Sequence, residues 1–348
     1  MSKKDTSFTW HYDQKDTFNP PSSDQPVTVY ADPGPTEPPP DDMVTYFGKV
    51  EEAAGLAMNA RNYTLVLRPP AADREILTRW FGQAESTLIS IEGGTVFYDT
   101  SLNKNFDFAI ATPAAITIGD KSSLKIGVAG GGDIFYKDDL VEGPGFTLKG
   151  DSSFEVEVNG GSANHASSFV LNDTSRITTS GNGVTFTRST ITLKNSANLT
   201  ATGRGDALSV AFQGSASISL NDRATVDIYS DSLDFEQFTP KGSFFTLNFA
   251  DTRLIFLPLT KGAEPFEFGK GKYPKAMFNF IKDSAPSNQS RIFIPGLNLQ
   301  AAFLRQAMVK DQVLAINGTI VQDTNLIDQK TESINGHYGT WISLSKKP

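Results

Sequence analysis

ITIGDKSSLKI, at residues 116–126, is the first clear copy of an eleven-residue pattern that decides the fold of this chain. Five further copies follow, and they begin at Phe146, Phe169, Ile191, Ile218 and Phe245. A weaker copy, ISIEGGTVFYD, begins at Ile89, and successive starts lie 27, 30, 23, 22, 27 and 27 residues apart. A period in this range is typical of a solenoid, in which each repeat buries its apolar face only against the next repeat.

Apolar and polar residues alternate within each copy, on both sides of a central turn. The first column contains only Ile or Phe, and the third column contains Ile118, Leu148, Leu171, Leu193, Leu220 and Leu247. A period of two is expected from strands that have one buried face. Each copy therefore predicts two short strands, and the remaining residues of each period supply a third side.

The turn between the two strands has its own composition. Its fifth column contains Asp120, Gly150, Asp173, Asn195 and Asp222, which are residue types that tolerate left-handed backbone angles. The seventh column contains Ser122, Ser152, Ser175, Ala197 and Ala224, all of them small. A small inward side chain lets the backbone bend sharply without overfilling the interior. The pattern therefore predicts a corner at the same place in every repeat.

These features predict an all-β fold, a single-stranded parallel β-helix of about seven coils over residues 88–257. Stacked coils would pair each strand with its counterpart about 4.8 Å along the axis. An antiparallel sandwich is the alternative, because it also has short alternating strands and glycine-rich turns. Repetition of a whole corner in register favours the solenoid.

The x-I-x-L-x-N-x-A-x-L pattern resembles the coils of right-handed parallel β-helices. Pertactin-type autotransporter passengers, filamentous adhesins and phage tailspikes contain such coils. The resemblance covers residues 88–257 and concerns the fold alone, so it implies no functional residue. The N-terminal MSKKDTSFTWHYDQ departs from the autotransporter pattern, since it lacks the apolar core of a secretory signal.

Residues 1–42 contain eight prolines and predict an extended arm. Aromatic residues in its first half leave two alternatives, a disordered tail or a peptide that docks on a partner protein or a neighbouring subunit. In the second alternative Trp10, Tyr12 and Phe18 are the docking residues, and the arm attaches the protein to a larger assembly.

The segments that flank the repeats predict caps for the open ends of the solenoid. Residues 43–87 predict a helical N-terminal cap, with helices at 50–61 and 71–85. Residues 258–348 predict a C-terminal cap that contains a basic and aromatic loop, a helix at 300–311 and two or three closing strands.

Composition excludes several classes of function. The 31 Lys and Arg against 39 Asp and Glu give a net charge of −8, which argues against a nucleic-acid partner. The absence of cysteine excludes a disulfide scaffold and a cysteine nucleophile. No run approaches the roughly 18 apolar residues of a membrane span. We expect synthesis in a cytoplasm without a signal peptide, and action outside the cell or on a virion stays open.

No strong catalytic or cofactor motif is present. The glycine-rich GVAGGGD at 127–133 is interpreted as a tight loop because no helix follows it. His11, His165 and His337 are too scattered for a metal site, and His165 is expected on a surface loop. We therefore expect neither a metal nor a cofactor.

Loop carboxylates supply the one candidate for catalysis. Glycoside cleavage needs two carboxyl groups at a fixed separation. The weak candidates lie on two loops and are Asp133, Asp138, Asp139, Asp231 and Asp234. Acidic loops on an acidic protein are ordinarily solvated, which is the alternative interpretation.

Lysine and aromatic residues are interleaved at 260–290, a combination that can stack on sugars or bind an acidic polymer. The candidate ligand residues there are Lys270, Lys272, Tyr273 and Lys275. The alternative is a long loop folded over the last coils with its lysines in solvent.

The sequence thus favours a non-enzymatic recognition or structural module that acts in surface adhesion or receptor binding, within a bacterial or phage assembly. A surface glycan is the expected ligand. The alternatives are a polysaccharide lyase or hydrolase of the β-helix type that uses paired loop carboxylates, and the scaffold of a secreted effector or toxin. An oligomer stays open, although no coiled-coil heptad supports one.

Overall fold

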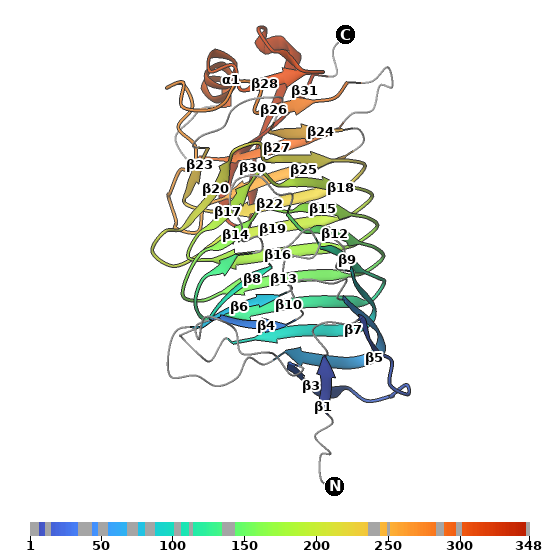
Figure 1. Cartoon of the computed structure of the whole chain (residues 1–348). Coiled ribbons are helices and arrows are strands. Elements are labelled where there is room, and N and C mark those ends of the chain that lie inside the picture. Colours follow the sequence, from blue (N-terminus) through green and yellow to red (C-terminus); the bar gives the residue numbers. More distant parts are fainter. Residues whose placement is uncertain are drawn as a thin grey trace. The chain divides into compact units, whose positions relative to one another are not determined.

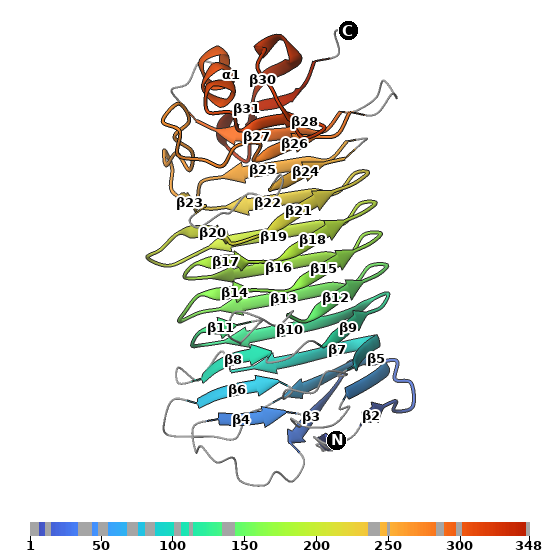
Figure 2. The ribbon, with the colours of Figure 1, turned by 45° about the horizontal axis from the view of Figure 1, so that its top comes forward.

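The computed structural model describes residues 7–10, 15–33, 44–47, 55–67, 76–80, 88–100, 106–110, 114–133, 143–235, 244–248, 251–282, 289–296 and 301–345. The chain forms two compact units. Unit 1 contains Met1–Val170 with Thr174–Asn182, and unit 2 contains Leu171–Asp173 with Gly183–Pro348. About 57% of the structure is strand and 4% is helix, and the strands form a long, mostly parallel sheet (Figures 1 and 2). The expected all-β, solenoid-like fold is confirmed.

Parallel strands stack coil upon coil in unit 1. One sheet contains two ladders that both start at β7 (Leu88–Asp99). The first continues with β9 (Ala115–Ile118) and β12 (Gly145–Leu148), and the second with β10 (Ser122–Val128), β13 (Ser153–Val158) and β16 (Arg176–Gly181), while β15 (Ser168–Leu171) begins in this unit. A second sheet supplies the third side with β4 (Val44–Phe47), β6 (Ile76–Trp80), β8 (Phe106–Ile110), β11 (Gly132–Asp133) and β14 (Ala163–His165). The repeat therefore corresponds to successive coils.

The register of these strands follows the columns of the repeat. Ile116 lies opposite Phe146 in the β9–β12 pair, and Leu124 lies opposite Phe154 in the β10–β13 pair. Their side chains are buried, and the rings of Phe146 and Phe169 stack at 4.8 Å with an interplanar angle of 16°. Such ring pairs contribute about 0.5–1.5 kcal/mol beyond the burial of their area. Phenylalanine in the first column thus forms a ladder inside the coils.

The weak copy at Ile89 is a genuine coil. It forms β7, in which Ile89 lies opposite Ile116 and Ile91 lies opposite Ile118. After the corner the strand continues, and Gly94 lies opposite Ser122. One long strand therefore replaces the two short strands of the later copies.

The helices expected at 50–61 and 71–85 are wrong wherever the structure describes these residues. Residues 55–61 belong to β5 (Gly55–Leu67), and residues 76–80 form β6. The buried side chains in the first half of β5 are Leu56, Met58 and Ala60. Their spacing has the period of a strand, and pairing with β7 outweighs the helix propensity of Leu, Ala and Met in this segment.

The extended arm expected over residues 1–42 is wrong for 7–10 and 15–33. These residues contain β1 (Ser7–Trp10), β2 (Lys15–Phe18) and β3 (Val27–Pro33), and β2 and β3 both pair in parallel with β5. Trp10 is 1% exposed and Phe18 is 8% exposed, so both rings belong to the interior of unit 1 rather than to a docking peptide. The coils therefore begin well before residue 88, and Tyr12 lies outside the described residues.

Unit 2 has the same kind of architecture. Its parallel strands are β17 (Val184–Thr187), β18 (Thr190–Leu193), β19 (Asn198–Gly203), β20 (Ser209–Gln213), β21 (Ser217–Leu220), β22 (Thr225–Tyr229), β23 (Ser232–Asp234), β24 (Phe245–Leu247), β25 (Arg253–Leu257), β26 (Phe278–Phe280), β27 (Arg291–Pro295) and β28 (Leu314–Ile316). The last three extend the coils beyond the expected boundary at 257, since β24 pairs with β26 and β26 with β28. Phe245 and Phe278 stack at 5.6 Å in this extension.

Two hairpins and a helix follow in the C-terminal part of unit 2. The helix expected at 300–311 is confirmed as α1 (Ala301–Lys310). The hairpins join β28 to β29 (Thr319–Ile320) and β30 (Ile327–Ile334) to β31 (His337–Leu344), and the 3₁₀ helix η1 (Thr324–Leu326) lies between them. Both turns are Asn-Gly pairs with positive φ, as two-residue hairpins require. Because β31 pairs antiparallel with β27, it covers an edge that would otherwise be open.

The corners of the coils confirm the predicted turn chemistry. Asp173, Asn195 and Asp222 have φ angles of 60°, 58° and 59°. The Asn195 side-chain amide donates to Asp173 Oδ1 at 3.1 Å, and its backbone N–H donates to Asp222 Oδ2 at 3.0 Å. These bonds form a ladder of Asx side chains along one corner of unit 2. In the copy at 116–126, however, Lys121 rather than Asp120 has the positive φ.

Candidate functional site

A cleft of about 440 Å³ lies on unit 2, beside the segment that joins β25 to β26. One wall contains Asp231, Ser232, Leu233, Asp234 and Phe235, and the other contains Glu264, Pro265, Glu267, Lys272 and Tyr273. We call it the acidic–aromatic cleft. It brings together two of the loop carboxylates and two of the loop ligand residues that the sequence suggested separately.

Asp231 ties the first wall to the start of the segment that carries the second wall. β23 is held by β20, which aligns Ser232 with Ser209. Asp231 Oδ1 accepts the backbone N–H groups of Leu259 at 2.7 Å and Thr260 at 2.8 Å. Burial raises the pKa of Asp231, but these bonds and one from the Thr260 side chain outweigh it and leave the pKa below its ordinary value. Asp231 is therefore an ionised anchor for the start of that segment.

A second carboxylate shapes the other wall. Asp311 follows directly after α1 and accepts the backbone N–H groups of Gly269 at 2.5 Å and Gly271 at 3.1 Å. The two glycines have φ angles of +94° and +66°, which side chains rarely adopt. The bends that precede Lys272 thus depend on glycine at both positions and on a carboxylate about forty residues away.

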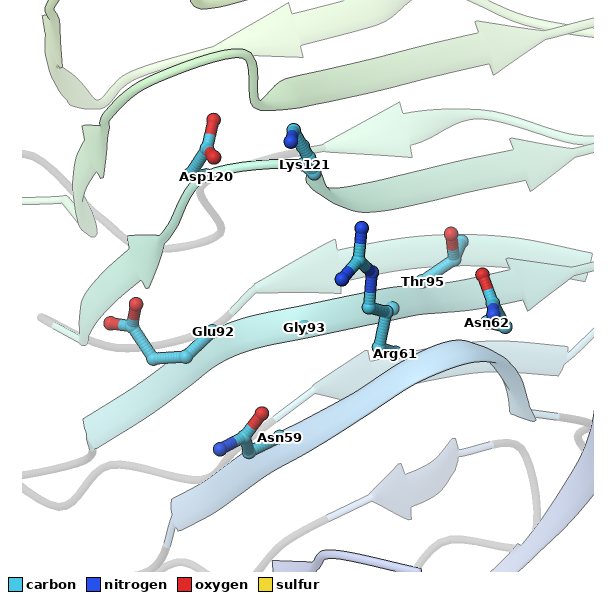
Figure 3. A pocket seen from close by; sticks show the side chains of 9 residues that line it. Asn59, Arg61, Asn62, Glu92, Gly93, Thr95, Asp120 and Lys121 are labelled. Carbon is cyan, nitrogen blue, oxygen red and sulfur yellow. The ribbon is translucent and has the colours of Figure 1, made fainter. Parts of the chain in front are cut away.

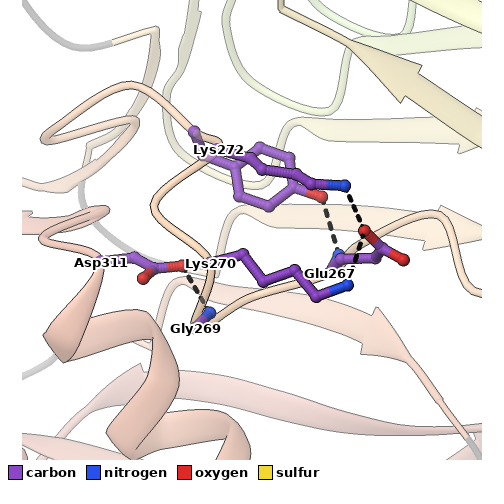
Figure 4. A network of polar contacts seen from close by, with 6 residues as sticks. Glu267, Gly269, Lys270, Lys272 and Asp311 are labelled. Atoms are coloured by element: carbon purple, nitrogen blue, oxygen red, sulfur yellow. Dashed lines mark hydrogen bonds and ion pairs between the residues drawn. The ribbon is translucent and has the colours of Figure 1, made fainter.

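An ion network lies at the rim of the cleft. Figure 4 shows Lys270 and Lys272 both reaching the carboxylate of Glu267, with a Lys270 Nζ to Glu267 Oε2 distance of 3.3 Å. The hydrogen bond from Lys272, followed by the contact with Lys270, lowers the pKa of Glu267, and Glu267 raises the pKa of Lys272. Because these side chains are exposed, the ion pairs contribute little to stability, and their main effect is on the charge at the rim of the cleft.

One aromatic ring lines the cleft on each wall. The Tyr273 hydroxyl accepts the backbone N–H of Glu267 at 2.8 Å, which fixes the ring within the loop. The Tyr273 ring lies 5.8 Å from Phe235 and 5.0 Å from Phe268, measured between ring centroids. Burial is the main cause of the raised pKa of Tyr273. Phe235 and Tyr273 are half-buried and line the cleft from its two walls.

The lining combines carboxylate acceptors, one ammonium group and half-exposed rings. Carboxylates accept hydrogen bonds from hydroxyl groups, and rings pack against apolar C–H surfaces. A few polar groups beside apolar surface are what a small-molecule site requires. The arrangement suits a ligand that carries both hydroxyl groups and apolar faces.

The electrostatics of the cleft differ from those of a glycosidase. A general acid needs a carboxyl group with a raised pKa. At the cleft the shifted carboxyl groups, Asp231 and Glu267, both have lowered pKa values. Burial raises the pKa of Asp227, although a hydrogen bond from Asn198 opposes the shift, but Asp227 does not line the cleft.

The remaining candidates lie elsewhere. Lys275 is exposed and does not line the cleft. Asp138 and Asp139 fall outside the described residues, and of Asp133 only the backbone, in β11, is described. Sequence reasoning missed Glu264, Glu267, Phe235 and Asp311. Glu267 had a signal, because it lies within three and five residues of the two lysines that it binds.

His165 corrects a further expectation, since it is an interior residue and not a surface one. It ends β14, is 1% exposed, and its Nε2 lies 2.7 Å from Thr179 Oγ1. Burial lowers its pKa to about 3. The expectation failed because strand alternation, rather than loop position, decides where this side chain points.

The glycine-rich segment at 127–133 connects two strands inside a coil, as expected, and its tight loop is confined to residues 129–131 between β10 and β11. A Cβ added to Gly160 in the next coil would lie 1.8 Å from the Ala129 carbonyl oxygen, and Phe108 N–H donates to the Gly131 carbonyl. Backbones of neighbouring coils therefore approach closely there.

In the described ranges no three His, Asp or Glu side chains are grouped to hold a metal ion. Within the same residues, no helix has the length and apolar character needed to cross a membrane. No protein-family model, curated protein or solved structure matches this chain.

Proposed function

We propose that this protein is a non-enzymatic recognition module that binds a surface glycan in the acidic–aromatic cleft. The ligand class is a neutral or amino-bearing oligosaccharide, because the cleft contains four carboxylates and one lysine. Such binding serves adhesion or receptor recognition by a solenoid that presents the cleft on its side.

The convergence of Asp234 with Phe235 and Tyr273 in one open cleft carries this proposal. Asp234 is on β23, whereas Tyr273 lies in a segment held in place by Asp231 and Asp311. Anchored walls keep the cleft formed before the ligand arrives, which reduces the entropy lost on binding. The lowered pKa values of Asp231 and Glu267 favour binding over cleavage.

A glycan panel tests the proposal. The purified full chain is screened against neutral, amino-bearing and acidic oligosaccharides, and hits are measured by titration calorimetry. We expect a neutral or amino-bearing glycan to bind, and Tyr273→Ala and Asp234→Asn each to weaken its binding about tenfold. Binding by an acidic glycan alone, or by no glycan, contradicts the proposal.

Two matched variants control for general effects. Asp206→Asn neutralises an exposed turn carboxylate of unit 2 outside the cleft, and Tyr338→Ala removes a tyrosine that is 60% exposed. Both should bind the glycan like the parent protein. If either weakens binding as much as the cleft variants, the ligand does not occupy this cleft.

The glycans that bind are also used to distinguish binding from catalysis. Incubation with the protein is followed by assays for new reducing ends and for unsaturated uronides. Unchanged glycan supports a recognition module. Cleavage that is lost in Asp234→Asn would instead identify a polysaccharide-cleaving enzyme.

A further inference from the structure

A second cleft lies in unit 1, at the corner of three successive coils. It measures about 610 Å³ and is lined by Asn59, Arg61, Asn62, Glu92, Gly93, Gly94, Thr95, Asp120 and Lys121. Figure 3 shows that these side chains come from β5, from β7 and from the turn between β9 and β10. We call it the corner cleft.

An irregular corner in β5 creates this space. The register between β5 and β7 shifts on both sides of Asn59, and residues 60–63 stand opposite Gly94 alone in the next coil. Asn62 has a φ of 68° and its side-chain amide donates to the Ser23 carbonyl at 2.7 Å, which holds the enlarged corner in place. The corner cleft is therefore a built feature of the coil.

Glycine on the facing coil lets the backbones of β5 and β7 approach closely at the corner cleft. A Cβ at Gly94, where φ is +83°, would lie 2.4 Å from the Ala60 carbonyl oxygen. At Gly93 it would lie 3.2 Å from the Ala60 nitrogen. The absence of both side chains leaves a floor of backbone between the charged residues.

Two cations at the corner cleft have no ion-pair partner in the described part of the chain. Arg61 and Lys121 are both exposed, and Figure 3 shows the Arg61 guanidinium pointing toward the turn that carries Lys121. The two carboxylates of the cleft, Glu92 and Asp120, each accept a hydrogen bond from another group of the protein. Asp120 Oδ1 accepts the Asp151 N–H at 2.9 Å, and Glu92 Oε1 accepts the Ser90 hydroxyl at 3.3 Å.

These cations and carboxylates together determine what kind of ligand can bind in the corner cleft. A guanidinium binds a carboxylate, sulfate or phosphate through paired N–H donors, and an ammonium group adds a second positive charge. The second oxygens of Glu92 and Asp120 can accept hydroxyl hydrogens. A ligand that fits must therefore carry an oxyanion and hydroxyl groups together.

We propose that the corner cleft binds a sugar that carries an oxyanion. The oxyanion lies between Arg61 and Lys121, and the hydroxyl groups lie at Glu92 and Asp120. This inference does not depend on the acidic–aromatic cleft, which is on unit 2 and prefers the opposite ligand charge.

Titrations with simple probes test the inference. The full chain is measured by calorimetry and ligand-observed NMR with glucuronate, glucose 6-sulfate, glucose 6-phosphate, glucose and inorganic sulfate or phosphate. We expect at least one charged sugar to bind about tenfold more tightly than glucose and than the inorganic anions. Equal affinity for glucose, or for the inorganic anions, overturns the inference, and the three charged probes distinguish a carboxylate from a sulfate or phosphate.

Substitutions at the corner cleft test whether the charged sugar binds there. Arg61→Gln and Lys121→Gln should each lower the affinity for the charged sugar about tenfold and reduce its salt dependence. Arg223→Gln removes an exposed cation from the equivalent position of a later corner and should have no effect. Because both cations are exposed, circular dichroism should show folded variants. Binding that survives both changes, or that falls equally in Arg223→Gln, contradicts the assignment.

Discussion

At the scale of single residues, His165 shows how burial inside the coils changes the pKa of a titratable group. Its imidazole lies in unit 1 against the Thr179 hydroxyl, and burial lowers its pKa from 6.5 to about 3. The folded protein therefore keeps His165 neutral at pH values where the unfolded chain binds a proton. A pH-dependent loss of stability follows from this difference.

We predict that His165 destabilises the protein as the pH falls from about 6.5 toward 3. A depressed pKa gives stability that is complete above the unfolded value and is lost below it. The loss attributable to this residue should approach 1.4 kcal/mol per pH unit. Urea unfolding of parent and His165→Gln at pH 7, 6, 5 and 4 measures the difference, which isolates His165 from carboxylates common to both. Identical pH slopes would contradict the prediction.

Gly94 is a second informative residue, because its backbone conformation and surroundings require glycine. We predict that Gly94→Ala lowers the free energy of unfolding by more than 2 kcal/mol, because a positive φ and a clash with the Ala60 carbonyl act together. Gly262→Ala is the control, since Gly262 has a φ of +90° but nothing within 4 Å of an added Cβ. Gly262→Ala should lower the free energy of unfolding by only about 1 kcal/mol. Equal costs in denaturant unfolding would show that the close approach is unimportant.

At the scale of elements, the corner ladder joins neighbouring coils of unit 2. Asn195 bonds to Asp173 on one side and to Asp222 on the other. The backbone ladders of the strands are hydrogen-bonded in any parallel sheet, whereas these side-chain bonds are specific to the corner. The turn residues thus help to fix the register as well as the bend.

We predict that Asn195→Ala destabilises unit 2 by about 2 kcal/mol. The variant loses the side-chain hydrogen bond and places a Cβ residue at a φ of 58° without local compensation. Asn195→Gly loses the same bond but relieves the backbone cost, so it should be less destabilising. Thermal and urea unfolding of the three proteins test this order, and an alanine variant as stable as the parent would refute it.

At the scale of the whole molecule, the open edges of a parallel stack must be covered. In unit 2 the β30–β31 hairpin pairs with β27, and its Trp341 packs over Leu257 and Phe293 in one apolar cluster. Trp341 also contacts Arg291, whose guanidinium carbon lies 4.5 Å from the ring centroid. The hairpin therefore protects both backbone edge and apolar surface.

We predict that removing residues 327–348 makes the protein associate, because an unpaired edge and an apolar cluster become exposed together. Light scattering coupled to size exclusion should show oligomers or aggregates. Trp341→Ala keeps the edge paired, so it should lower the free energy of unfolding by about 3 kcal/mol without association. A truncated protein with the parent's oligomeric state would contradict the edge-protection argument.

The coils between Ile89 and Phe256 could be predicted from the sequence, because alternation, a small inward residue and a left-handed turn residue are all local properties. Sequence reasoning misjudged β1, β2, β3, β5 and β6, since the edge of an adjacent coil can recruit a segment whose own propensity is ambiguous. The two clefts could not be predicted in this way, because each is formed by residues that only the folded chain brings together. Asp231 and Thr260, or Asp311 and Gly269, are far apart in the chain, and their contact depends on how loops fold over coils.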